Sequence, residues 1–430
     1  MTTPRVHPAP APTPPPPRHG SALVRILRRA FSPFWVVPAL WCVGAFVAGV
    51  LLPEVDEQLA EQIPFLFQAG PDGARTFLSS IAGAMISVTG LVFSITIVVL
   101  QLASSQFSPR VLRTFLDQRT PQMTLGVFTA SFVYALTVMR SVEGTEATGS
   151  GGVPQLAVTV AFLMVLASVG MFLAFIHHIT QAISVDTIID EVGDDTRSLL
   201  ERSTHGRTTV TETGSASLPD LGSAVVVTTE QAGYLNLVDA AGLCRLAHRH
   251  DVRVSVLHPL GTYLVQDSPL AVVHGGSGHA EVDWTTQVRR HVVVGWRRTM
   301  EQDVSFGLRQ LVDIGERALS PGVNDPTTAG QVVDELHSLL VRIAAVDDLS
   351  PVLHDDDGAP RVVTTEWTFG EYLDLCVDEI AHWGASSIQV PRRLDDMLTQ
   401  LATVATDAHR PVIERKRTWV GRIATAPGET

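Results

Sequence analysis

Four long stretches without a charged side chain dominate the first 179 residues of this 430-residue chain. An α-helix needs about 20 residues to cross the roughly 30 Å of hydrocarbon in a bilayer, and each stretch reaches that length. Helices at the surface of a soluble protein keep a polar stripe, which these stretches lack. The sequence therefore predicts an α-helical membrane bundle of four transmembrane helices within residues 31–179. The predicted spans are residues 33–52, 77–102, 120–139 and 155–176.

Charge is distributed unevenly between this part of the chain and the rest. Residues 1–179 carry a net charge of +2 and residues 180–430 one of −15, which together give the −13 of the chain. Arginines gather before the first span and between the second and third, whereas the alternate loops are acidic. Because cytoplasmic loops are enriched in Arg and Lys, we expect a multi-pass protein of the bacterial plasma (inner) membrane with both termini cytoplasmic. The acidic C-terminal region would repel phosphates, so we expect no nucleic acid partner.

Neither the N-terminal tail nor the cysteines point to a functional site. Eight prolines lie within residues 1–20, so residues 1–30 are expected to form a disordered cytoplasmic tail. Cys42, Cys244 and Cys376 are far apart and do not have the spacing of metal ligands. We therefore expect reduced thiols, no metal site and no cofactor.

The second span carries a seam of small and polar residues. Ser80, Ser87, Ser94 and Gln101 recur every seven residues, and Gly83 and Gly90 follow the first two serines by three. Such a seam lets membrane helices approach closely and form hydrogen bonds across the contact. Two interpretations stay open: the seam packs against other spans of the same chain, or it lines a polar pathway in an oligomer.

The C-terminal region is predicted to have an α+β architecture. Residues 180–220 are expected to form a helical extension of the fourth span, reaching residue 202, and then a linker. A small β-rich module is predicted over 221–299, in which residues 233–235 form a turn into a helix over 236–250. A helical module is predicted over 300–425. The expected strands are 224–228, 252–257, 270–274 and 291–296, and the expected helices of the second module are 303–319, 326–346, 369–383 and 391–408.

The joint between the first two of these helices carries a candidate polar network. Asn324 or Asp325 can cap the second helix, at whose first position Pro326 is favoured. The preceding helix presents Arg309, Asp313 and Arg317 at intervals of four residues. Either the arginines clamp the loop in a buried network, or the loop and this ladder bind a small anion or a partner subunit.

Several strings in the chain resemble a family of bacterial predicted membrane proteins called domain-of-unknown-function family 2254. The resemblance covers about residues 30–410 and is best at Phe306–Asp313 and Arg317–Pro326. It implies a multi-span inner-membrane protein with a cytoplasmic domain, and it assigns no catalytic residue. The other matching strings are residues 90–94, 101–110, 175–179, 233–235 and 301–303.

These patterns favour a protein that is not an enzyme, because no nucleophile, metal or phosphate-binding motif stands out. The first hypothesis is an oligomeric channel- or transport-type protein in the lipid bilayer, with a cytoplasmic assembly or gating domain. A homo-oligomer is its expected form. The alternative is a membrane-anchored sensor or scaffold whose cytoplasmic domain binds a ligand or partner.

Overall fold

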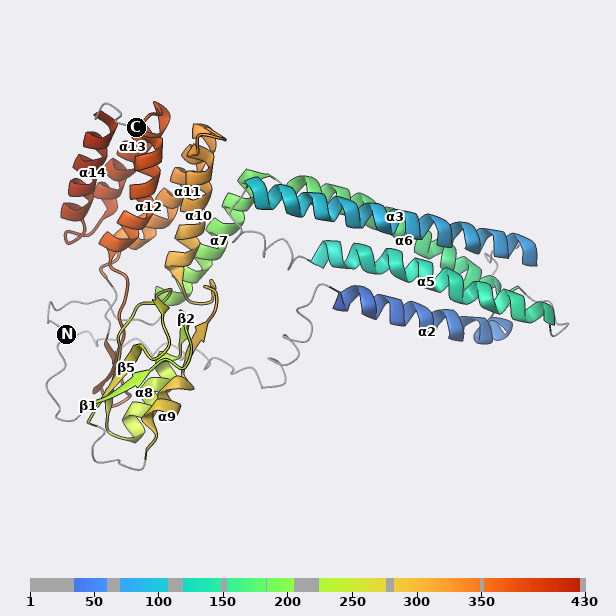
Figure 1. Ribbon diagram of the computed structural model, residues 1–430, viewed down its shortest axis with the longest axis horizontal. Coiled ribbons are helices and arrows are strands. Elements are labelled where there is room, and N and C mark those ends of the chain that lie inside the picture. Colours follow the sequence, from blue (N-terminus) through green and yellow to red (C-terminus); the bar gives the residue numbers. More distant parts are fainter. Residues whose placement is uncertain are drawn as a thin grey trace, which may run out of the picture. The chain divides into compact units, whose positions relative to one another are not determined.

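A computed structural model describes residues 35–59, 70–106, 119–147, 153–182, 184–204, 224–275, 282–348 and 352–425 (Figure 1). They form two compact units, and the second contains residues 99–106 as well as the described residues from 179 on. The four helices that precede residue 184 are together called the membrane unit below. Residues 184–425 are called the C-terminal region.

The membrane unit consists of the helices α2 (Val36–Leu59), α3 (Pro71–Gln106), α5 (Arg119–Ala147) and α6 (Gln155–Ala182) (Figure 1). Within the described residues, these four are long and apolar enough to cross a membrane. The prediction of four membrane helices followed by an α+β region is therefore confirmed. The helices run past the C-terminal ends of the predicted spans, because the backbone hydrogen bonding continues into the polar residues that follow each apolar segment.

Helix α5 lies at the centre of the membrane unit. Half of its membrane-spanning window is buried, against 11% for α2 and 22% for α3 and α6. Its polar side chains face the other helices: Ser131 Oγ lies 3.1 Å from Ser168 Oγ of α6. Tyr134 donates a hydrogen bond of 3.0 Å to the carbonyl of Ala157. These polar groups are thus paired inside the unit, as hydrocarbon surroundings require.

The fourth span does not continue as one helix to residue 202. Helix α6 ends at Ala182, and a new helix, α7, covers Val185–Thr204. The backbone N–H of Ile188 donates to the carbonyl of Ser184, which opens the new helix. Apolar spacing alone could not reveal this break, because it persists on both sides of the interruption.

The C-terminal region contains a five-stranded sheet and a three-stranded sheet. The first has the order β1-β5-β3-β8-β7 and the second β4-β2-β6. All neighbouring strands are antiparallel except β3 and β8. The strands are β1 (Ala224–Thr228), β2 (Gly233–Val238), β3 (Arg253–Val256), β4 (Tyr263–Leu264), β5 (Pro269–His274), β6 (Val292–Gly295), β7 (Val352–His354) and β8 (Pro360–Val363).

Two features of these sheets differ from the sequence prediction. Residues 233–235 begin strand β2 instead of forming a turn, and Leu235 is fully buried in the sheet core. Gly233 is required there because a Cβ would lie 2.6 Å from the carbonyl oxygen of Gly295 on β6. Strands β7 and β8 lie in the range predicted to be helical, and β8 pairs with β3 about 100 residues earlier. Helices α8 (Ala240–Arg249) and α9 (Trp284–Arg289) contribute to the core of this part.

The remaining helices share one apolar core with α7. Close approach to α7 depends on two glycines: a Cβ on Gly307 would lie 2.1 Å from Thr196 Oγ1, and one on Gly193 would lie 2.1 Å from Glu335 Oε1. These helices are α10 (Val304–Leu319), α11 (Pro326–Ala344), α12 (Phe369–Gly384), α13 (Gln389–Val404) and α14 (Arg410–Thr425). Helix α14 lies within the predicted helical module but beyond its four predicted helices.

Candidate functional site

The predicted seam lies on the exposed face of α3. The opposite face of the helix is buried at a similar spacing, at residues such as Ala74, Leu78, Met85 and Val92. Within the membrane unit, therefore, the four helices pack through the apolar face of α3 and leave the seam uncovered. The exposed seam residues are Ser80, Gly83, Ser87, Gly90, Ser94 and Gln101.

The two glycines of the seam have empty space beside them. A Cβ on Gly83 or Gly90 would have no neighbour within 4 Å, whereas one on Gly126 of α5 would lie 2.6 Å from Trp41 of α2. Ser80 and Ser87 donate hydrogen bonds of 2.8 and 2.9 Å to the carbonyls four residues before them. The hydroxyl groups of these serines are therefore hydrogen-bonded within their own helix. The exposed face on which they lie is available for contact with another helix.

The structure divides the predicted C-terminal network into two parts. Arg309 binds Asp313 at 2.6 Å and Glu316 at 2.8 Å, and it pairs with Glu379 of α12. Burial and the neighbouring Glu379 raise the pKa of Glu316. Arg309 therefore links α10 to α12, and the sequence missed this link because Glu379 is 70 residues away.

The loop between α10 and α11 forms the second part. Asp325 caps α11 by accepting hydrogen bonds of 3.1 Å from the N–H groups of Thr327 and Thr328. These hydrogen bonds and that of the Thr328 hydroxyl lower the pKa of Asp325. Asn324 is exposed and adopts a left-handed conformation with φ of 49°. Arg317 is also exposed, and its carbonyl accepts from Ser320. The loop therefore caps α11 through Asp325, one of its own residues.

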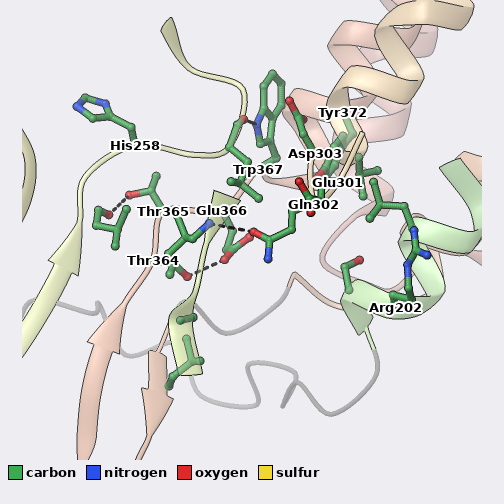
Figure 2. A pocket seen from close by; sticks show the side chains of 18 residues that line it. Arg202, His258, Glu301, Gln302, Asp303, Thr364, Thr365, Glu366, Trp367 and Tyr372 are labelled. Carbon is green, nitrogen blue, oxygen red and sulfur yellow. Dashed lines mark hydrogen bonds between the residues drawn. The ribbon is translucent and has the colours of Figure 1, made fainter. Parts of the chain in front are cut away.

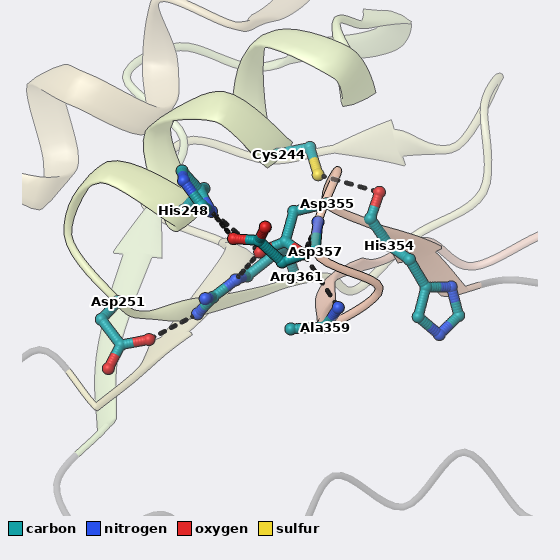
Figure 3. A network of polar contacts seen from close by, with 8 residues as sticks. All are labelled: Cys244, His248, Asp251, His354, Asp355, Asp357, Ala359 and Arg361. Atoms are coloured by element: carbon teal, nitrogen blue, oxygen red, sulfur yellow. Dashed lines mark hydrogen bonds and ion pairs between the residues drawn. The ribbon is translucent and has the colours of Figure 1, made fainter.

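The turn between β7 and β8 holds a compact polar cluster (Figure 3). Ligand atoms of His248, Asp355 and Asp357 lie within 4.8 Å of one another, the spacing of a possible metal site. The Asp355 carboxylate, however, already accepts from the N–H of Asp357 and of Ala359, and one oxygen lies 2.6 Å from Arg361 Nε. Arg361 and His248 hold the pKa of Asp355 well below its usual range. The cluster therefore serves to fix the turn.

A concave site in the described part of the C-terminal region is a cavity of about 410 Å³. That volume lies in the range of small-molecule pockets. The end of α7, the start of α10, the loop after β8 and the start of α12 all contribute to it. Figure 2 shows residues 301–303 between Arg202 of α7 and the segment 364–366.

Hydrogen bonds hold the walls of this cavity in place. Trp367 donates 3.1 Å to the carbonyl of Leu260, and its ring stacks on Tyr372 with centroids 5.6 Å apart. Asp303 is buried and pairs with Arg298 at 2.7 Å. The aromatic wall is thus rigid, and Asp303 is neutralised by a partner.

A second cavity of about 160 Å³ adjoins the first. Both cavities are lined by Ser203, Val304, Glu366, Trp367 and Tyr372, and the two together are called the groove below. Burial, together with Glu366 and Asp303, raises the pKa of the Tyr372 phenol. Its hydroxyl therefore stays protonated at neutral pH.

Sequence reasoning did not predict this groove. Its lining comes from separate segments spread between Leu199 and Tyr372, and only tertiary packing brings them together. The one signal in the sequence was the string Glu301-Gln302-Asp303, in which an acidic residue precedes the N-cap Asp303 of α10. In the sequence, that string stands out only by its resemblance to the family.

Comparisons with known proteins agree with this architecture. The family model of predicted membrane proteins named domain-of-unknown-function family 2254 matches residues 32–400. An uncharacterised protein of Mycobacterium tuberculosis H37Rv is 32% identical over 388 residues, which cover 88% of this chain and 73% of that protein. An uncharacterised protein of Mycobacterium bovis has the same identity and coverage. No solved structure matches the chain.

Proposed function

Because the chain belongs to family 2254 of predicted membrane proteins, it is an integral membrane protein, and we propose that it works as a homo-oligomeric channel- or transport-type protein without enzymatic activity. In this proposal the seam of α3 meets other copies of the chain and lines or braces a pathway. The C-terminal region assembles or gates the complex. The exposure of all six seam residues is the observation that carries the proposal.

Lipid tails are as apolar as leucine, so helices in a bilayer associate through close packing of small residues and through hydrogen bonds between polar ones. The seam offers both, and Gln101 adds an exposed amide that needs water or a polar partner. The predicted spans contain no ionisable residue of the kind that ion-coupled pumps place in the membrane. Passive movement along a polar surface therefore fits the composition better than ion-coupled transport.

The orientation of the chain is part of the proposal. Both termini are placed in the cytoplasm of a bacterium, with the protein in its plasma membrane, because arginines mark the loops on that side. A reporter fused after Thr430 is expected to be active in the cytoplasm, and one inserted near Gly149 is expected outside. The reverse pattern would move the C-terminal region to the other side and contradict the proposal.

Cysteine accessibility tests the pathway. Ser87→Cys and Ser94→Cys are made in a background carrying Cys42→Ala and Cys244→Ala. Cys376 can stay, because it is fully buried and burial raises its pKa. Both new thiols are expected to react with a membrane-impermeant thiol reagent, since only a hydrated thiol ionises.

Leu163→Cys on α6 is the matched control. Leu163 is exposed on the surface of the membrane unit but lies outside the seam, so its thiol should face hydrocarbon and stay unreactive. Equal reactivity at position 163 would show that labelling reports general access. No reaction at positions 87 and 94, in a folded protein, would contradict a hydrated pathway.

The second candidate function is a membrane-anchored sensor or scaffold. The groove in the C-terminal region favours it, because a rigid aromatic wall beside carboxylates is suited to binding a small molecule. The two candidates differ in what the seam does. A single copy, or a dimer whose seam is sealed by lipid, would favour the sensor.

A further inference from the structure

The membrane unit contains an apolar cavity of about 470 Å³, which residues of α2, α5 and α6 line. On α2 the lining residues run from Leu40 to Ala48, which is about 12 Å along the helix axis. The small residues Gly44 and Ala45 lie between them, and a Cβ on Gly44 would meet no atom within 4 Å. The cavity therefore follows the direction of the membrane helices.

Two aromatic side chains that line the cavity are held in place by α5 and α6. Helix α2 lies along α5 (Figure 1), and a Cβ on Gly126 of α5 would lie 2.6 Å from the ring of Trp41. Glycine at this position thus lets the Trp41 ring pack directly on α5. Tyr134 of α5 is buried, and its hydroxyl donates a hydrogen bond of 3.0 Å to the carbonyl of Ala157 on α6. The cavity is therefore bordered by fixed aromatic rings.

The indole N–H of Trp41 points to a ligand. Among the described residues it has no hydrogen-bond acceptor, and an unpaired N–H is costly in hydrocarbon. Trp41 lies about 8 Å along the helix from Val36, where the candidate membrane span begins. Tryptophan is enriched at this level, where the hydrocarbon meets the polar interface. From Trp41 the cavity extends toward the middle of the span, as far as Ala48.

These features together match the shape and chemistry of a lipid. Its acyl chain is apolar, lies along the bilayer normal and begins at an ester carbonyl, which is a hydrogen-bond acceptor at the interface. Water fits less well, because a buried water needs two to four polar partners, and the Tyr134 hydroxyl already donates to Ala157.

We propose that this cavity holds one acyl chain of an anionic glycerophospholipid, whose ester carbonyl accepts a hydrogen bond from the Trp41 indole N–H. An anionic head group is favoured because Arg25, Arg28 and Arg29 precede α2 in the sequence, and arginines beside a membrane helix attract anionic lipids. The proposal uses neither the α3 seam nor the groove of the C-terminal region, so it holds for either candidate function.

Native mass spectrometry of the full-length protein in mild detergent tests this proposal, with palmitoyl-oleoyl phosphatidylglycerol as the probe. One lipid per chain is expected to stay bound when further detergent removes the rest. Phosphatidylcholine with the same acyl chains should be retained about fivefold less. No retained lipid, or equal retention of the two lipids, would overturn the proposal.

Variants locate the bound lipid. Gly44→Leu should abolish its retention, because the new side chain fills the cavity. Gly170→Leu on α6 is the matched control, since its Cβ also meets nothing within 4 Å and the residue does not line the cavity. Trp41→Phe should weaken retention about threefold to tenfold, the scale of one lost hydrogen bond. Trp35→Phe, at an exposed position outside the cavity, should have no effect.

The same mass spectra distinguish a lipid from a second copy of the chain. If Gly44→Leu releases subunits instead of lipid, another copy fills the cavity and the proposal is wrong. Retention that falls equally with Gly170→Leu would also contradict it, because general lipid contact would then explain the binding.

Fluorescence quenching gives an independent measurement that does not require Gly44→Leu to fold. In protein carrying Trp35→Phe, Trp41 is the remaining tryptophan of the membrane unit. Phosphatidylglycerol brominated in its acyl chains should quench Trp41 with saturation near one lipid per chain, and unlabelled phosphatidylglycerol should reverse the quenching. Quenching that rises in proportion to the lipid fraction without saturation would overturn the proposal. Thiol labelling at positions 87 and 94 is unaffected by these results, so this proposal and the pathway can fail independently.

Discussion

The membrane unit and the C-terminal region distribute their apolar and polar side chains in opposite ways. In the membrane unit the large apolar side chains, such as Leu163 and Leu173, point outward, and polar groups such as Thr124 and Ser131 are buried. In the C-terminal region the apolar side chains form the core, and ion pairs join the helices from outside. An exposed side chain therefore has to be interpreted differently in the membrane unit and in the C-terminal region. An exposed leucine on α6 suits a lipid-facing surface, whereas an exposed glycine on α3 leaves room for another helix to approach closely.

The largest expected difference between the units concerns leucine. Leu308→Ala in the fully buried C-terminal core should destabilise that region by about 2–5 kcal/mol, because it leaves a cavity. Leu163→Ala, at a position 56% exposed on α6, should change stability little, since no protein cavity forms. Denaturation in detergent, followed by circular dichroism, measures both. An equal loss at both positions would contradict the assignment of α6 to a lipid-facing surface.

The next largest effect concerns the seam. If the seam packs tightly against another copy of the chain instead of lining a hydrated pathway, Gly90→Leu should dissociate the proposed oligomer while leaving each chain folded, because overpacking a close helix contact costs about 1–3 kcal/mol. Gly170→Leu on α6 is the matched control, since its Cβ also meets nothing within 4 Å. Light scattering on the purified protein gives the oligomeric state. An unchanged complex with Gly90→Leu, or the same dissociation with Gly170→Leu, would remove the seam from the subunit contact.

Capping in the C-terminal region should have a smaller effect. Asp325→Ala should cost about 1 kcal/mol, because the first N–H groups of α11 lose their acceptor. Asn324→Ala should cost about 1 kcal/mol for a different reason, the left-handed φ of 49°.

Asn324→Gly separates these two causes. Glycine adopts a left-handed conformation without steric penalty, so this variant should melt close to the unaltered protein. A loss as large as that of Asn324→Ala would mean that the Asn324 side chain itself makes a contact that stabilises the loop.

The smallest expected effect is a pH dependence of the C-terminal core. Burial lowers the pKa of His337 on α11 below its usual 6.5, and its Nε2 atom is buried without a hydrogen-bond partner. The unfolded chain therefore binds the proton more readily than the folded one. The stability from neutral His337 is present above pH 6.5 and is lost as the pH falls through the lower folded pKa.

Melting temperatures between pH 8 and pH 5 check this expectation. The unaltered protein should lose more stability on acidification than His337→Leu does. Identical pH profiles would show that His337 titrates normally and that other groups govern the acid response.

The sequence alone determined those features that depend on neighbouring residues. Hydrophobic length predicted the four membrane helices, because crossing a bilayer is a property of one contiguous segment. Heptad spacing placed the seam residues on one face of α3, and Asp325 with Pro326 predicted the start of α11. In each case the relevant partners lie within a few helical turns.

Only the tertiary structure decided the features that join distant segments. Strand β8 pairs with β3, Arg309 pairs with Glu379, and the groove combines residues from 199 to 372. Nothing in the local pattern around residues 233–235 separates a turn from strand β2, whose identity depends on pairing with β6. The sequence also could not predict that the seam is exposed. Heptad spacing is the same whether a helix face packs against the same chain or against another chain. Such pairings depend on which distant surfaces complement one another, and this complementarity exists only once the chain has folded.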